Sequence, residues 1–193
     1  MLITAERLIE TPVMSLQTGG QLARTKTPLI DPRNLMIVAY ELDGPALDTH
    51  PSFLMMRDVR ELSNLGLIVD SSDEFIGLDD VVKIREVYDF RFELVGKTVR
   101  DRNGTKLGKV SGYSIEPGSF MIKQLNVRRP LLKSLTDTEL IIDRTQITEV
   151  NDVEIIITND ERQPTPVKRA AKSFTNPFRG TSPQPEAIDR REN

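Results

Sequence analysis

The stretch IEPGSFMI at residues 115–122 has a near copy, IDPRNLMI, at residues 30–37. When residues 13–42 are placed over residues 98–127, an offset of 85, six of thirty positions are identical without a gap. Ordinary composition would give about two identities. The identical pairs are Gly19/Gly104, Leu22/Leu107, Ile30/Ile115, Pro32/Pro117, Met36/Met121 and Ile37/Ile122. The chain therefore contains an internal repeat.

The repeat resumes in the second part of each copy. LMMRDVRELSNLGLIVD, from Leu54, corresponds to LIIDRTQITEVNDVEIII, from Leu140. The final strands align at an offset of 88, with Leu67 over Ile155 and Val69 over Ile157. A period of this length exceeds that of solenoid repeats, which is about 20–50 residues. It predicts two copies of a small domain.

Each copy has the pattern of β-structure. Asn103-Gly104 and Gly19-Gly20 mark a hairpin at the same place in the two copies, because these residues accept positive φ. Further strands are expected around residues 53–56, 67–70, 140–143 and 153–158. Five or six short strands per copy favour a small closed barrel, because closure removes exposed sheet edges.

The repeated motif itself predicts a turn followed by a strand. Pro117-Gly118 favours a type II turn, whereas Pro32-Arg33 favours type I. The strand after the first turn is apolar on both faces, so we expect both faces to be covered, one of them by the other copy. The alternating residues are Met36, Val38, Tyr40 and Leu42 on one face and Leu35, Ile37 and Ala39 on the other.

A short helix is expected between the copies, at residues 78–90. Asp79 or Asp80 is the candidate N-cap, and Val81, Ile84 and Tyr88 follow at helical spacing. The alternative is a strand that continues into residues 91–99. With the helix, the predicted domains are a first barrel at residues 1–77, the bridging helix at 78–90, a second barrel at 91–160 and a disordered basic tail at 161–193.

The composition excludes several chemistries. The 193 residues are 38% hydrophobic and 28% charged, and they include one His and no Cys. Disulfides, thiolate metal sites and cysteine nucleophiles are therefore excluded, and a reducing compartment is favoured. The N-terminus resembles neither a signal peptide nor a membrane anchor, and no apolar run approaches the ~20 residues of a membrane span. We expect a cytoplasmic protein.

The net charge of −3 is unevenly distributed. From Glu161 onward, seven basic and four acidic residues give +3, which leaves 19 basic and 25 acidic residues, or −6, for the body. Five Pro and the lack of alternation predict that this tail is disordered. Its basic and aromatic residues suit RNA, an anionic membrane or a protein groove, or they only keep the chain soluble. The candidate binding residues are Lys168, Arg169, Lys172, Phe174, Phe178 and Arg179.

A second candidate partner-binding segment is VRRPLLKS, just past the central strand of the second copy. It is either a basic docking site with apolar anchors or an ordinary loop whose leucines close the barrel. The first copy has the acidic DGPALDTH at this place, so the two copies differ here. The candidate residues are Arg128, Arg129, Leu131, Leu132 and Lys133.

The sequence offers no convergent set of catalytic groups. The single His50 lies in a polar loop, where it is either a general base or a solvated side chain. GxSxG, HExxH and GxGxxG motifs do not occur. We therefore expect no enzymatic activity, no cofactor and no metal site.

Residues 94–127 of the second copy read LVGKTVRDRNGTKLGKVSGYSIEPGSFMIKQLNV. This motif resembles the PRC-barrel domain, which occurs in the H subunit of the photosynthetic reaction centre and at the C-terminus of the ribosome maturation factor RimM. The matching features are a Gly before the first strand, a hairpin Gly, a Leu-Gly pair, an acidic-Pro turn and the closing strands ELIIDRTQITEV and EIIIT. These features are Gly96, Gly104, Leu107-Gly108 and Glu116-Pro117. In the first copy Thr11 stands near the place of Gly96 and Ala23 replaces Gly108, and the likeness spans residues 8–160.

The resemblance implies an all-β protein of two tandem PRC-like barrels that acts as an adaptor. We expect a non-catalytic scaffold that binds another protein through its barrels. The first alternative is an RNA- or ribosome-associated processing or assembly factor that uses the basic tail. The second is a peripheral membrane-associated protein held by the same tail.

Overall fold

Each copy of the repeated motif forms the closed end of a long hairpin. β3 (Gln21–Asp31) continues into β4 (Met36–Asp43), and β10 (Lys106–Glu116) continues into β11 (Met121–Arg128). In the computed structural model, which describes residues 1–45, 47–129 and 139–158, both loops have the same conformation. The amide of Leu35 donates to the carbonyl of Asp31 and that of Phe120 to the carbonyl of Glu116, each at 2.8 Å.

The two loops also share one unusual backbone angle. Leu35 and Phe120 have φ values of 50° and 53°, in the left-handed region that non-glycine residues rarely adopt. A type II turn would place the positive φ on Gly118, but that glycine does not have one. The predicted type II turn is therefore wrong, and the copies differ less than their sequences indicate.

The two hairpin ends meet and hydrogen-bond to each other. The amide of Ile37 donates to the carbonyl of Phe120, and the amide of Ile122 donates to the carbonyl of Leu35, both at 3.0 Å. Met36 lies opposite Met121 in this pairing. Each copy of the motif thus completes the other copy's backbone hydrogen bonds at this junction, which we call the seam.

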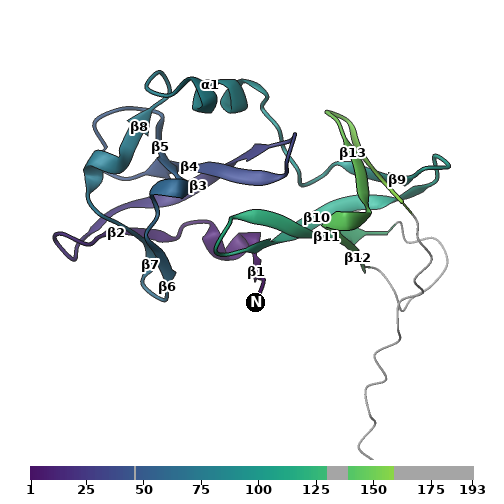
Figure 1. Cartoon of the computed structure of the whole chain (residues 1–193), viewed down its shortest axis with the longest axis horizontal. Coiled ribbons are helices and arrows are strands. Elements are labelled where there is room, and N and C mark those ends of the chain that lie inside the picture. The colour runs from purple at the N-terminus through teal and green to yellow at the C-terminus, as the bar shows by residue number, and fades with distance from the viewer. Residues whose placement is uncertain (46, 130–138, 159–193) are drawn as a thin grey trace, which may run out of the picture. The chain divides into compact units, whose positions relative to one another are not determined.

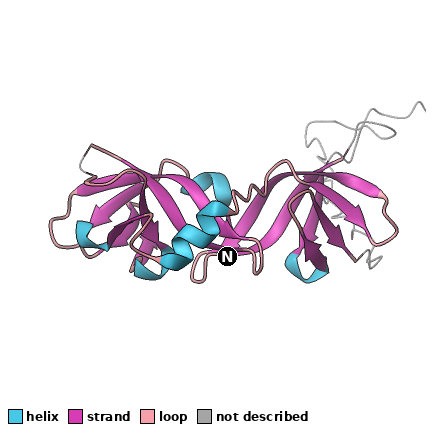
Figure 2. Cartoon of the chain, turned by 90° about the horizontal axis from the view of Figure 1, so that it is seen from above, coloured by secondary structure: helices cyan, strands magenta, loops and turns pink. Residues whose placement is uncertain are grey.

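Strands dominate the described residues, so the predicted mainly β fold is confirmed (Figures 1 and 2). Besides the two long hairpins, the first half contains β1 (Ile3–Thr4), β2 (Pro12–Ser15), β5 (Ser52–Met55), β6 (Glu61–Ser63), β7 (Gly66–Val69) and β8 (Phe75–Gly77). The second half contains β9 (Thr98–Asp101), β12 (Glu139–Asp143), β13 (Ile147–Val150) and β14 (Glu154–Ile157). The helical elements are α1 (Val82–Asp89) and the 3₁₀ turns η1 (Ala5–Leu8), η2 (Met56–Asp58), η3 (Ser72–Glu74) and η4 (Arg144–Gln146).

The strands belong to one hydrogen-bonded sheet, in the order β13-β14-β9-β10-β11-β4-β3-β2-β7-β6. At its margins, β1 pairs with β10, β12 pairs with β11 and β8 pairs with β5. This sheet runs through the seam and is open. Closure of each half into a separate barrel is therefore not confirmed. The first 160 residues form one compact unit, and the predicted disordered tail at residues 161–193 lies outside the described residues.

The internal repeat is visible strand by strand. β2 and β7 are parallel, as are β9 and β14, whereas the hairpins around them are antiparallel. Both central hairpins pair in the same register, for example Ile30 with Ile37 and Ile115 with Ile122. In each half a 3₁₀ turn follows the equivalent strand, since η2 follows β5 and η4 follows β12. The sequence repeat therefore reflects two copies of one strand order.

The first strand of the repeat is shifted by one residue from the gap-free alignment. Val13 pairs with Ala23 and Val99 with Gly108, so the offset is 86 in this strand and 85 in the next. The connecting turn of the first copy is one residue longer. The counterpart of Gly96 is therefore Glu10, the residue before Thr11, near which we expected it. Gly96 and Glu10 both have positive φ.

The core reaches across the seam. The larger buried cluster contains residues from both halves, including Leu35, Ile37, Phe120 and Ile122. Near the seam, the prediction that the copies cover each other is therefore correct. Farther along β4 the cover is different, because Ala39 belongs to a second cluster that α1 completes. That cluster contains Leu29, Ala39, Phe53, Met55, Ile84 and Val87.

The predicted helix between the copies is α1, but neither predicted acid caps it. Its N-cap is Val81, which makes no side-chain cap hydrogen bond. Asp80 instead accepts a hydrogen bond from the amide of Gly77, and Asp79 forms an ion pair with Arg85. Packing of Ile84 and Val87 on the first half holds the helix in place.

Tyr40 provides a test of this core. Its ring is fully buried and its hydroxyl has no hydrogen-bond partner among the described residues, and burial raises its pKa far above the ordinary value. An unsatisfied buried hydroxyl destabilises a fold by about 1–3 kcal/mol. We expect Tyr40→Phe to raise the free energy of unfolding by about 1 kcal/mol in urea denaturation. Tyr88→Phe is the control without effect, since Tyr88 is 36% exposed and its hydroxyl is not among the buried groups that lack a partner. A loss of stability in Tyr40→Phe would contradict the assignment.

Candidate functional site

Two hollows flank the seam and are related by the repeat. The first, of about 410 Å³, lies between the turn of residues 32–35 and the segment from η4 to β13. The second, of about 400 Å³, lies between residues 117–120 and the segment from η2 to β6. Each hollow thus combines the turn of one copy with the corner of the other. The reciprocal pairing at the seam creates both.

The two hollows differ most at one position. Offsets of 85 and 88 make Pro32 equivalent to Pro117, Ile147 equivalent to Val59, and Arg144 equivalent to Met56. Met56 is a buried residue of the core cluster. Its counterpart Arg144 brings a permanent positive charge to the same place. The first hollow is therefore the chemically distinctive one.

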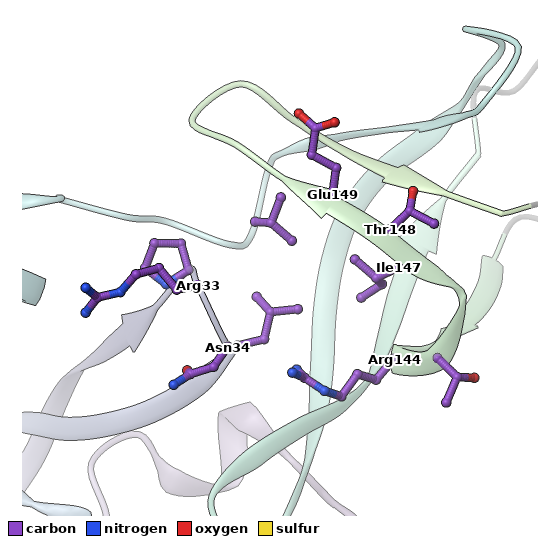
Figure 3. A pocket seen from close by; sticks show the side chains of 10 residues that line it. Arg33, Asn34, Arg144, Ile147, Thr148 and Glu149 are labelled. Carbon is purple, nitrogen blue, oxygen red and sulfur yellow. The ribbon is translucent and has the colours of Figure 1, made fainter.

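Arg144 lies across the floor of the first hollow. Figure 3 shows its side chain extending from η4 toward Asn34, beneath the turn of the first copy. One of its terminal nitrogens, Nη1, is buried and has no hydrogen-bond partner among the described residues. A guanidinium has five N–H donors and stays protonated, and therefore positively charged, at ordinary pH. Arg144 is half-buried and forms no ion pair with a described residue, including Glu149, the acidic residue that also lines this hollow.

Arg33, the other arginine of this hollow, is fully engaged and points away from Arg144 (Figure 3). It pairs with Asp31 at 2.9 Å and with Glu86 of α1 at 2.7 Å, and it lies 5.4 Å from the ring centroid of Phe90. These contacts tie α1 to the wall of the hollow. The charge of Arg33 is neutralised, and that of Arg144 is not.

The arginines of the second hollow also have acidic neighbours. Arg60 pairs with Asp70 at 2.6 Å, and Arg57 lies 3.6 Å from Asp58. Both guanidinium groups are mostly exposed to solvent, which screens them further. This hollow has nearly the same volume, but none of its arginine nitrogens is buried without a partner among the described residues, so it serves as an internal reference.

The residues predicted from the sequence do not gather at either hollow. Arg128 ends β11 opposite Glu139, at the far end of β12 from Arg144, and Arg129 is exposed beyond it. The other candidates, Leu131, Leu132, Lys133, Lys168, Arg169, Lys172, Phe174, Phe178 and Arg179, lie outside the described residues. His50 is exposed in its loop.

The internal repeat indicates Arg144 only when the two halves are aligned at the correct offset. We aligned Leu54 with Leu140, an offset of 86, whereas the strand pairing places Leu54 opposite Tyr40 and Ile142 opposite Leu125, an offset of 88. Only at 88 does Arg144 fall on Met56. A charged residue at a core position of a repeat is the pattern that indicates a site.

No known protein family matches this chain, and no curated protein is detectably similar to it. Within the described residues, no helix is long and apolar enough to cross a membrane. In the same part of the chain, His, Asp and Glu side chains nowhere gather in threes in a way that would hold a metal ion.

Asp31 should make the stability of the hollow's wall depend on pH. Its carboxylate is 3% exposed and accepts hydrogen bonds from the side chain and amide of Arg33, which lower its pKa. We expect Asp31→Asn to lower the free energy of unfolding by about 1.5–3 kcal/mol at pH 7. A folded-state pKa below the unfolded-state pKa of about 4 stabilises the fold at pH values above that unfolded-state pKa. This contribution is lost as the pH falls through the folded-state pKa.

The measurement is urea denaturation of both proteins between pH 7 and pH 2.5. The difference between them should shrink below about pH 4. Glu116→Gln is the matched control, since Glu116 occupies the equivalent position but is about half exposed. A difference that stays constant down to the lowest pH would exclude the charge of Asp31 as the cause.

Arg144 should destabilise the free protein. Substitution by Met, the residue of the equivalent position, removes the buried unsatisfied nitrogen. We expect Arg144→Met to raise the free energy of unfolding by about 1–3 kcal/mol in urea denaturation. Arg57→Met, at an exposed arginine of the second hollow, should leave it unchanged. If Arg144→Met lowers stability instead, its guanidinium is well satisfied and the hollow is only a structural feature.

Proposed function

We propose that the chain is a non-catalytic cytoplasmic adaptor that binds another protein through its two halves, and that these halves are tandem PRC-like barrel domains. The domain proposal is supported by the resemblance of residues 91–160 to that family. It is also supported by the common strand order of the halves, with one parallel and several antiparallel pairs in each. The proposed binding site is the first hollow.

The observation that supports binding is the unbalanced guanidinium of Arg144. A buried N–H group without a hydrogen-bond partner destabilises a fold by about 1–3 kcal/mol, and natural proteins tolerate such violations mainly at functional sites. A carboxylate is the group whose two oxygens match the N–H fork of a guanidinium. An Asp or Glu side chain of a partner protein, inserted between the turn of residues 32–35 and β13, would fit this requirement.

The seam makes the hollow suitable for a protein partner. Its walls belong to paired strands and to a turn fixed by hydrogen bonds, so they are held in place before the partner arrives. Preorganised walls reduce the ordering entropy that binding requires. The apolar side chains of Leu35, Ile147 and Val150 line the hollow beside Arg144, and they would reduce the contact of such an ion pair with water.

The alternatives, an RNA- or ribosome-associated factor and a peripheral membrane protein, depend on the tail. Tail-driven binding to a polyanion would weaken steeply between 50 and 200 mM salt, because counterions are released on binding. An ion pair enclosed in a hollow is screened much less. Salt dependence therefore separates these functions from the proposed one.

The experiment is capture of partners from native lysate by the full-length chain, with and without nuclease, at low and moderate salt. We expect a protein partner to be retained after nuclease treatment and on a chain that lacks residues 161–193. Arg144→Met should reduce its recovery by at least about tenfold, the loss expected from leaving a buried carboxylate unpaired.

Arg57→Met is the matched control and should retain the partner. A partner that Arg144→Met still captures at full yield would exclude the first hollow as the binding site. A partner that is lost with nuclease or with residues 161–193 would favour the RNA function or the membrane function instead.

A further inference from the structure

The edge of β5 in the first half is occupied by another strand. β8 pairs with it in antiparallel fashion, with Ser52 opposite Gly77, Phe53 opposite Ile76 and Leu54 opposite Phe75. Figure 1 shows β8 beside β5 at the margin of the sheet. This half therefore demonstrates that the strand after the central hairpin accepts a further strand on its outer edge.

The equivalent strand of the second half is β12. It pairs with β11 on one edge, and no described strand pairs with its other edge. At the offset of 88, the segment equivalent to β8 is residues 163–165, which read Gln-Pro-Thr where β8 reads Phe-Ile-Gly. Pro164 has no N–H to donate and the apolar residues are missing. Within the described residues, the acceptor edge therefore occurs twice and the covering strand once.

The side chains of β12 give this edge a specific chemistry. Glu139, Ile141 and Asp143 are exposed and follow at alternate positions, so they share one face of the strand, whereas Ile142 between them is buried. Ile141 is 61% exposed and is equivalent to Phe53, which is fully covered beneath α1 and beside β8. In β12, the exposed Ile141 between two carboxylates thus stands where β5 has the buried Phe53.

We propose that the outer edge of β12, which no described strand covers, binds an extended segment of a partner protein by antiparallel strand addition. The segment carries an apolar residue with a basic residue two positions away on each side. The backbone of the segment pairs with β12 as β8 pairs with β5. Its apolar side chain lies beside Ile141, and its basic side chains lie beside Glu139 and Asp143, since cross-strand pairs of opposite charge are favourable.

The same charges exclude a second copy of this chain. Antiparallel pairing of two β12 edges would place Glu139 of one copy near Asp143 of the other, and like charges directly opposite each other destabilise a sheet. Charged side chains on an edge strand prevent self-association in this way. A basic segment of a different protein is the occupant that the edge favours. The edge and the hollow at Arg144 are separate sites, so either can fail without the other.

The test uses the full-length chain and the synthetic peptide Gly-Lys-Thr-Val-Thr-Lys-Gly, blocked at both ends. Backbone amide NMR should show shifts concentrated at residues 139–143 as the peptide is added. The same peptide with Glu in place of both Lys should bind at least about tenfold more weakly, because two favourable charge pairs become repulsive. In an antiparallel strand the N–H groups of successive residues face opposite edges. N-methylation of Val, or of the Thr before it, should therefore abolish binding in one of these two peptides and leave it unchanged in the other.

Ile141→Lys should reduce binding of the lysine peptide by at least about tenfold, because it removes the apolar contact and introduces a like charge. Val153→Lys is the matched control, since Val153 is an exposed apolar residue outside β12, and it should bind normally. The proposal would be overturned by no binding, by equal binding of the glutamate peptide, or by shifts on other strands. A gain of more than about tenfold on removal of residues 161–193 would also overturn it, because the tail would then be the occupant.

Discussion

Two reciprocal hydrogen bonds fix the relation between the halves, and much of the described structure depends on them. They join the amides of Ile37 and Ile122 to the carbonyls of Phe120 and Leu35, the two residues with left-handed backbones. Such a backbone costs a non-glycine residue roughly 1–2 kcal/mol. Here it buries the side chains of Leu35 and Phe120 in the shared core and directs each carbonyl to the opposite copy. The backbone strain therefore lies at the same two residues as the burial and the hydrogen bonds that offset it.

Because the two halves share this frame, the chemical differences between them can be assigned to single positions. Met56 of the core becomes Arg144, and Phe53 beneath α1 becomes the exposed Ile141. Leu29 and Ala39, which α1 covers, become Ser114 and Gln124, neither of them in a buried cluster. The first half thus has an apolar outer face with its own cover. In the second half the equivalent face carries polar groups, and a charged residue lies at the seam.

The sequence predicted what depends on local patterns. The repeat, the hairpin at Gly104 and the apolar strand after each Pro could all be read from residue spacing. The turn type could not, because Gly118 offers a positive φ that pairing at the seam assigns to Phe120 instead. The N-cap of α1 could not be read either, since packing of Ile84 decides the start of that helix. Arg144 was hidden by a two-residue error in aligning strands whose pairing partners lie far away in the sequence.

The order of charges along the second half favours a protein partner over a nucleic acid. β12 presents Glu139 and Asp143, and Arg144 follows directly with its side chain in the hollow. A polyanion would be attracted by the arginine and repelled by the strand beside it, within a few residues of the same chain. A polypeptide can carry both signs in a defined order and can therefore satisfy both places. Complementarity of this mixed kind contributes to selectivity more than to affinity, because it penalises every partner whose charges follow in another order.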